Sequence, residues 1–296
     1  MDFLKEQLAR LVYDYSIKGK FADEQFFNTA INLCIEAFDI KDYVKDYKAI
    51  SDKDKERFAG YNIGTRKITL DILKQRNAVL ERINVEKRAG ISSSTFETCL
   101  KVNIDVVNSI IHEIMHACQY KKCLQDEDDI QRELIELSFP KNLSIVRGNK
   151  LSKKMIEYYK ILDALENDDV FYASIPAERM ANISGLEFER DISKLISSSK
   201  KEKIDNYTDA RLLLGKIQSY SDYSPTAFVK SINESIKKEI HIPHETSDIS
   251  VIERRLKRLS KENDLSLDDR LFLGFPIAVD EEREIKRKVV ELKKRL

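Results

Sequence analysis

The chain has 296 residues, with 51 basic and 51 acidic side chains that give a formal net charge of zero, and it contains 8 Gly, 5 Pro and no Trp. This length fits one large domain or two of ordinary size. The low Gly and Pro content argues against low-complexity structure and against a sandwich of many tight turns. The neutral charge balance argues against nucleic-acid binding. We expect an α+β protein that is predominantly helical.

The N-terminal part of the chain, up to Leu73, is predicted to form two helices followed by a small β-sheet. Apolar residues at helical spacing favour two amphipathic helices within residues 1–40, with Gly19 and Asp23 marking the join. A short strand is expected near residues 43–50, and a hairpin over residues 58–73. The returning strand from Lys67 is either a sheet edge along which an extended peptide lies, or an inner strand of the same sheet.

Helices are predicted for most of the remaining chain. Asn103 is expected to cap the helix that ends near Tyr120, and Pro176 to occupy the first helical position of a later helix. The polar segment 197–203 is the best candidate for a linker. The predicted helices span residues 72–89, 103–120, 128–137, 151–165, 176–196 and 281–296.

These patterns predict three parts in the chain: an N-terminal helical segment (1–40), a catalytic domain (41–199) and a helical C-terminal region (200–296). The C-terminal region either packs a solvated face on the catalytic part or forms a lobe that binds a regulatory partner or gates substrate. The chain start has acidic residues where a signal peptide needs a basic start, and no stretch approaches 18 uncharged apolar residues. We expect a cytoplasmic protein without a membrane partner. The four cysteines are expected to be free thiols: Cys34, Cys99, Cys118 and Cys123.

The chemistry-bearing motif is His112-Glu-Ile-Met-His116. Residues four apart lie one above the other on a helix, so both imidazoles can bind one ion. Zinc favours imidazole nitrogen and, in catalytic sites, keeps one position open for water. Glu113 is positioned to take a proton from that water. The motif therefore predicts a zinc (Zn²⁺) site with His112 and His116 as ligands and Glu113 as the general base.

The residues around the motif are uncharged and mostly apolar, which indicates a helix buried on most sides. Two His and a Glu inside such a helix need a reason, because buried polar groups without partners are costly. The alternative interpretation is a core helix whose His pair hydrogen-bonds to backbone or to carboxylates.

A third ligand is expected from a later element, because no His occurs between residues 116 and 241. Glu178 is the best candidate, since it lies in the first turn of the helix that starts at Pro176, with small Ala177 and Ala181 nearby. The alternative is an ordinary acidic residue favoured by the helix dipole. Asn182, one turn on, is predicted to hydrogen-bond the outer nitrogen of a ligand His.

The apolar-flanked His112–His116 motif, followed well downstream by Glu178-Arg-Met-Ala, resembles the gluzincin branch of zinc metallopeptidases. The segments 110–120 and 175–182 are similar to small metallopeptidase-like proteins of bacteria, phages and mobile elements. The resemblance covers roughly residues 40–200. It implies a zincin-like fold, with a small sheet over the active-site helix and a glutamate ligand from a second helix. Asn182 stands where many gluzincins have an acidic residue one turn after the ligand.

This interpretation predicts a metalloprotease that hydrolyses a protein or peptide substrate, with zinc as cofactor. Tyr172 is the first choice for the catalytic donor to the oxyanion, with three residues behind it: Tyr223, His241 and His244. The last two otherwise form a surface turn or a second metal site. Two other functions stay open: zinc-assisted hydrolysis of a non-peptide amide or ester, and a non-catalytic regulatory protein stabilised by the metal.

Overall fold

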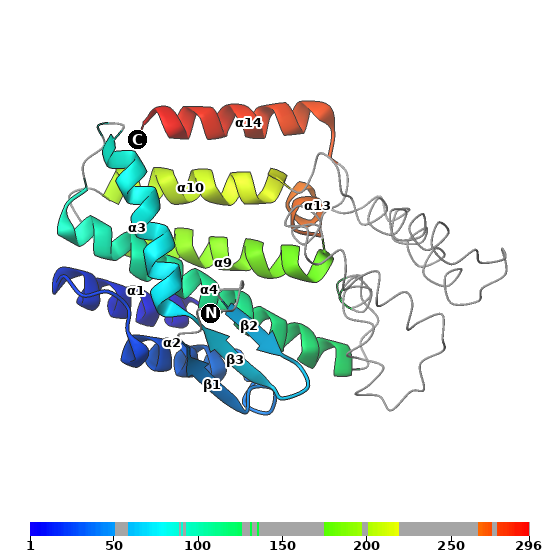
Figure 1. Ribbon diagram of the computed structural model, residues 1–296. Coiled ribbons are helices and arrows are strands. Elements are labelled where there is room, and N and C mark those ends of the chain that lie inside the picture. The colour runs from blue at the N-terminus through cyan, green and yellow to red at the C-terminus, as the bar shows by residue number, and fades with distance from the viewer. Residues whose placement is uncertain are drawn as a thin grey trace, which may run out of the picture. The chain divides into compact units, whose positions relative to one another are not determined.

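The computed structural model describes these parts of the chain: residues 1–50, 59–88, 90, 93–125, 131, 135, 175–196, 201–218, 266–273 and 277–295. Within them the protein is predominantly helical with one small three-stranded sheet, so the expected α+β class is confirmed (Figure 1). None of the helices in this part of the chain is both long enough and apolar enough to span a membrane.

By its contacts the chain divides into two compact units, and each is described by itself. The first unit comprises Met1–Lys121, Ser184–Leu212 and Val289–Leu296, and the second comprises Lys122–Ile183 and Leu213–Lys288. The boundaries expected at residues 40 and 199 stay a prediction.

The N-terminal helices are α1 (Asp2–Ile17) and α2 (Glu24–Ala37), as the apolar spacing predicted. The join forms where the sequence indicated it. Gly19 adopts a φ of 65°, a left-handed conformation that favours glycine. Asp23 caps α2 by accepting a 2.9 Å hydrogen bond from the backbone N–H of Phe26.

The sheet contains β1 (Asp46–Ala49), β2 (Ala59–Asn62) and β3 (Lys67–Leu70) in the order β1-β3-β2. β3 pairs antiparallel with β2, as a hairpin requires, and parallel with β1. Both edges of β3 are therefore occupied, so the interpretation of this strand as a substrate-bearing edge is wrong and the inner-strand alternative is correct. Its buried residues, Ile68 and Leu70, alternate with half-buried ones, as expected for a strand with one face on the core.

Two helices follow the sheet: α3 (Ile72–Arg88), as predicted, and α4 (Thr95–Leu124), which begins well before the predicted Asn103. The start is set by a capping box. The Ser94 hydroxyl accepts a hydrogen bond from the backbone N–H of Glu97, and the Glu97 carboxylate accepts one from the backbone N–H of Ser94. The spacing Ser-x-x-Glu is a readable sequence signal that outweighs the single Asn.

Asn103 instead lies in the interior of α4 and is fully buried. Its Oδ1 accepts a 2.7 Å hydrogen bond from the backbone N–H of Ala22. Its Nδ2 donates to the hydroxyl of Ser16 and to the carbonyl of Lys20, both at 3.0 Å. The side chain therefore fastens α4 to the connection between α1 and α2.

The remaining helices are α9 (Pro176–Leu195), α10 (Lys201–Gln218), α13 (Leu267–Leu273) and α14 (Val279–Lys294). α9 begins at Pro176 as predicted, and α14 matches the expected terminal helix. The end of the predicted linker, residues 201–203, lies in α10. The helices predicted at 128–137 and 151–165 fall almost entirely outside the described residues.

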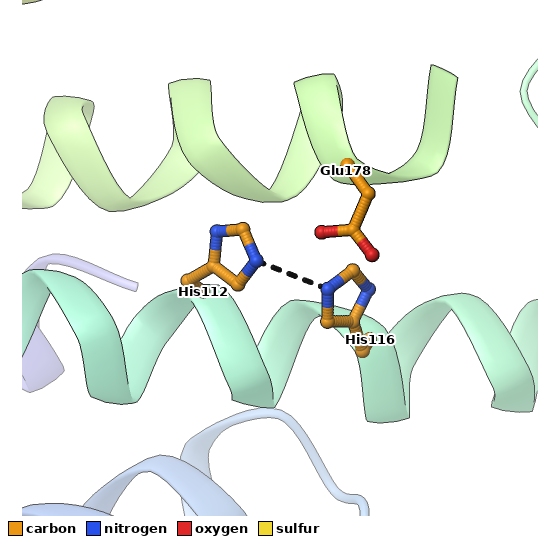
Figure 2. Close-up of side chains that lie close together, drawn as sticks. All are labelled: His112, His116 and Glu178. Atoms are coloured by element: carbon orange, nitrogen blue, oxygen red, sulfur yellow. Dashed lines mark hydrogen bonds between the residues drawn. The ribbon is translucent and has the colours of Figure 1, made fainter. Parts of the chain in front are cut away.

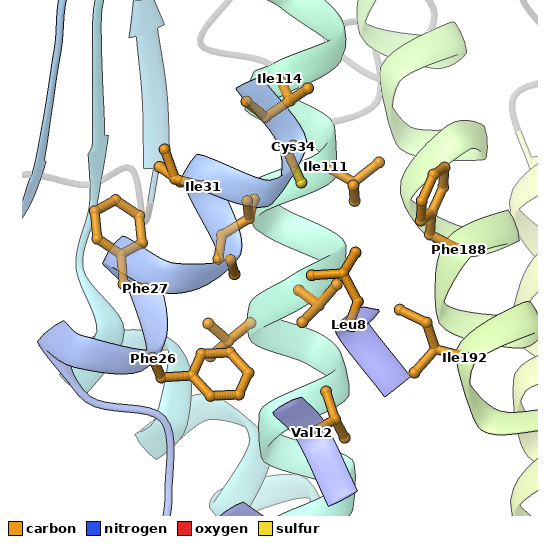
Figure 3. Packing of buried hydrophobic residues seen from close by; sticks show 14 of the residues in the cluster. Leu8, Val12, Phe26, Phe27, Ile31, Cys34, Ile111, Ile114, Phe188 and Ile192 are labelled. Carbon is orange, nitrogen blue, oxygen red and sulfur yellow. The ribbon is translucent and has the colours of Figure 1, made fainter. Parts of the chain in front are cut away.

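The core of the first unit is formed by residues of α1, α2, α4 and α9 with the inner face of the sheet. Figure 3 shows Phe188 and Ile192 of α9 directed toward Ile111 of α4 and Leu8 of α1. α9 is thereby held against α4 by apolar packing over the part that begins at Ser184. All four cysteines are free, as expected, and Cys34 lies inside this core.

We predict that Asn103→Ala lowers the free energy of unfolding by about 2 kcal/mol or more, because the buried N–H of Ala22 loses its acceptor. Urea unfolding followed by circular dichroism measures the change. The matched control is Asn32→Ala, because Asn32 is exposed and accepts one hydrogen bond, from Tyr47. A loss no larger than that of the control would contradict the role assigned to Asn103.

Candidate metal centre

Three side chains from two helices bring metal-ligating atoms together. One ligand atom each of His112, His116 and Glu178 lies within 4.8 Å of the other two. Figure 2 shows both imidazoles rising from α4 toward α9, and the Glu178 carboxylate reaching from α9 toward them. These are the three residues that the sequence predicted as ligands, and the described residues hold no other such group.

The two imidazoles present the same ring atom to each other. The Nε2 atoms of His112 and His116 are 3.1 Å apart. Two nitrogens bound to one tetrahedral zinc lie ~3.3 Å apart, given Zn–N distances of about 2.05 Å. The spacing of one turn on α4 therefore places the rings close to the separation that a shared ion requires.

The other ring nitrogen of His116 has a partner of its own. Its Nδ1 lies 2.9 Å from the Oε1 of Gln119. Because a carbonyl oxygen can only accept, this contact is a hydrogen bond in the tautomer that carries the proton on Nδ1, and that tautomer leaves the lone pair of Nε2 for a metal. His116 and Gln119 are buried at 6% and 4% exposure, so the ring has little freedom to turn. Gln119 thus fixes the tautomer in which His116 can bind a metal.

The sequence assigned this role to Asn182, but Asn182 is exposed on α9. No hydrogen bond joins its side chain to either imidazole in the part of the chain that the structure describes. Sequence reasoning missed Gln119, although it lies one turn after His116 and so shares its helix face. The spacing from Glu178 favours Asn182, but Gln119, which contacts the His116 ring, lies on the same helix as His116.

Glu178 lies in the first turn of α9 and is 8% exposed. At this end of a helix the dipole attracts negative charge, so an acidic side chain is well placed there. The next residue, Arg179, anchors this end of the helix within the second unit. It donates from Nε and Nη2 to the carbonyl of Leu271 in α13, and from Nη2 to the carbonyl of Lys216 in α10 at 2.7 Å.

Two further predicted site residues are Glu113 and Tyr172. Glu113 lies directly after His112 on α4 and is 5% exposed, and it is not part of the three-ligand group. Tyr172 falls outside the described residues, as do the three other candidates for the oxyanion donor: Tyr223, His241 and His244.

No protein-family model, no curated protein and no solved structure matches this chain. Two imidazole nitrogens and a carboxylate oxygen are a donor set that suits zinc and several other divalent metals.

We expect Gln119→Ala to weaken metal binding on the order of 10-fold or more, because His116 loses the partner that fixes its ring. Competition between the protein and a chromophoric chelator, with zinc as the probe, measures the affinity. Gln125→Ala is the control, because Gln125 is exposed just beyond the end of α4. Equal affinity in the two variants would show that the bond to Gln119 is dispensable.

Proposed function

We propose that this protein is a zinc-dependent metallopeptidase of the gluzincin type, with a zincin-like catalytic domain. The observation that carries the proposal is the convergence of His112, His116 and Glu178, with Glu113 next to the first ligand. Only the two imidazoles and the intervening glutamate share a motif; Glu178 comes from a separate helix much later in the chain. The arrangement agrees with the one implied by the resemblance of the sequence to gluzincins.

The donor set fits zinc as the resident ion. His112 and His116 would supply Nε2 atoms and Glu178 a carboxylate oxygen, which leaves a tetrahedral ion one position for water. When bound in such a site, zinc lowers the pKa of water and polarises a substrate carbonyl. Within the described chain no cysteine is close enough to join the group, so a closed structural site of cysteine ligands is not favoured.

Glu113 would act as the general base. A carboxylate that is not a ligand can take the proton of the attacking water on one of its oxygens and then deliver it to the leaving amine. Glu113 is 5% exposed and directly follows the first ligand in the chain, so its place on α4 is consistent with this task. Tyr172 remains our proposal for the oxyanion donor, with Tyr223, His241 and His244 as alternatives.

The proposed substrate is a protein or peptide in the cytoplasm, cut as by an endopeptidase, and a regulatory protein partner is part of the proposal. Hydrolysis of a non-peptide amide or ester would use the same residues. A non-catalytic protein in which zinc holds two helices together would need the ligands but not Glu113. The role of Glu113 therefore separates the catalytic functions from the structural one.

The decisive variant is Glu113→Gln, which keeps the shape of the side chain and removes its basicity. We expect unchanged zinc content and unfolding temperature, and turnover lower by on the order of 10²–10⁴-fold. Mass spectrometry of a proteome-derived peptide library, incubated with zinc-loaded protein, measures cleavage, and a set of activated esters tests the non-peptide alternative. Glu81→Gln, on the exposed face of α3, is the control.

Equal cleavage by wild type and Glu113→Gln would refute the proposed mechanism. Zinc binding without any hydrolysis in either protein would favour the non-catalytic alternative. If wild type hydrolyses esters but not peptides, and Glu113→Gln loses the ester hydrolysis, the proposed substrate class changes and the proposed site stands.

A further inference from the structure

α9 approaches α4 very closely at a glycine. If Gly185 carried a methyl group, its carbon would lie 2.5 Å from Oδ1 of Asn108 and 2.9 Å from the backbone carbonyl oxygen of Asn108. Ordinary van der Waals contacts of such a carbon start at 3.4 Å. Any side chain at this position would therefore push the two helix backbones apart, because a backbone carbonyl inside α4 cannot turn away on its own.

A buried carboxylate holds the same two helices in register. Glu189 of α9 is 2% exposed. Its Oε2 accepts a 2.6 Å hydrogen bond from Nδ2 of Asn108, and its Oε1 pairs with Arg211 of α10 at 2.8 Å. Arg211 also contacts Asp105 of α4, which pairs with Arg82 of α3. One carboxylate of α9 is thus bound by both neighbouring helices.

The balance of charges explains why this carboxylate needs two partners. Burial raises the pKa of Glu189 above its usual range, although Arg211 and the bond from Asn108 oppose the shift. Burial also acts on Asp105, yet Arg211 and Arg82 outweigh it and hold the pKa of Asp105 below its ordinary value. Removing a partner would leave a desolvated group without compensation, so the geometry of the cluster is strongly preferred.

The contact points and the ligands lie along one line on each helix. On α9, Gly185 and Glu189 follow Glu178 by about two and three helical turns. On α4, Asn108 precedes His112 by one turn, and His116 follows by another. α9 is one continuous helix without an internal proline, so its position at Gly185 constrains its first turns.

We propose that Gly185, Asn108 and Glu189 are positioning residues for the metal centre: they fix the separation and rotation of α9 on α4, and so the place of Glu178 relative to the two imidazoles. The inference rests on the metal site of the proposed function and extends it to residues that touch no ligand. Asn108 serves twice, as the surface that Gly185 meets and as the donor to Glu189.

The helix displacement that a methyl group at Gly185 would cause is larger than the deviation that metal–ligand distances tolerate. Relief of the 2.9 Å contact requires a displacement of about 0.5 Å, since the methyl carbon needs at least 3.4 Å. Metal–ligand distances tolerate deviations of about 0.2 Å. Glu178 is 8% exposed, so its carboxylate has little room to compensate by swinging across the gap.

The test compares Gly185→Ala with Gly60→Ala, because a methyl group at Gly60 meets no atom within 4 Å. We expect Gly185→Ala to bind zinc on the order of 10–100-fold more weakly than wild type, and the control to match wild type. The cobalt-substituted protein gives the second readout. Its visible absorption reports coordination geometry, and a merely structural role would leave that spectrum unchanged. Asn108→Ala is the second variant, with a smaller loss of affinity and a changed cobalt spectrum expected.

Wild-type affinity together with a wild-type cobalt spectrum in Gly185→Ala would overturn the inference while leaving the proposed metallopeptidase intact. If Gly185→Ala does not fold, the same two readouts on Asn108→Ala decide. If wild type itself binds neither zinc nor cobalt, the proposed metal centre fails, and this inference fails with it. Absence of peptide cleavage alone does not affect the result, because both readouts concern the metal.

Discussion

Polar atoms buried between helices must be matched by partners, because an uncompensated polar group costs several kcal/mol and a charge costs more. Helix α4 carries two imidazoles and a glutamate in a segment otherwise rich in Ile and Val, and α9 brings a carboxylate to the same place. Two facing Nε2 atoms can share one proton at most, and the carboxylate of Glu178 brings negative charge. A divalent cation would accept a lone pair from each of the three side chains at once, which is the role proposed for them.

That surrounding structure has two layers of support. The apolar contacts of Phe188 and Ile192 press α9 onto the core, but such contacts are non-directional and leave the helix free to slide. Directional interactions remove this freedom. Gly185 sets how near the backbones come, and Glu189, bound on both oxygens, sets the rotation. Arg179 adds an anchor at the start of α9 through two carbonyl oxygens of the second unit.

Local signals in the sequence predicted much of this fold. The helix and hairpin patterns indicated the order of elements up to α4, and the motif with Glu178 indicated the three side chains whose potential ligand atoms converge. The predicted start of α4 is wrong because a lone Asn103 is a weaker capping signal than the Ser94–Glu97 pair. The central place of β3 depends on its pairing with β1, which is a non-local choice that hydropathy does not encode.

The parts of the site that the sequence did not predict are those that depend on how one helix faces another. Asn182 has the right spacing from Glu178, but the rotation of α9 points it to solvent. The partner of His116 is Gln119 on its own helix. Gly185 and Asn108 lie far apart in the sequence, and neither belongs to a recognisable motif. Such contacts are fixed by tertiary packing, which local sequence patterns do not encode.

The central claim is that two imidazoles and one carboxylate bind a single divalent ion. X-ray absorption spectroscopy at the zinc edge, on protein loaded with one equivalent of zinc, tests it most directly. We predict a first shell of nitrogen and oxygen at about 2.0–2.1 Å with the outer-shell scattering of two imidazoles. A sulfur shell near ~2.3 Å, or a single imidazole, would contradict the assignment.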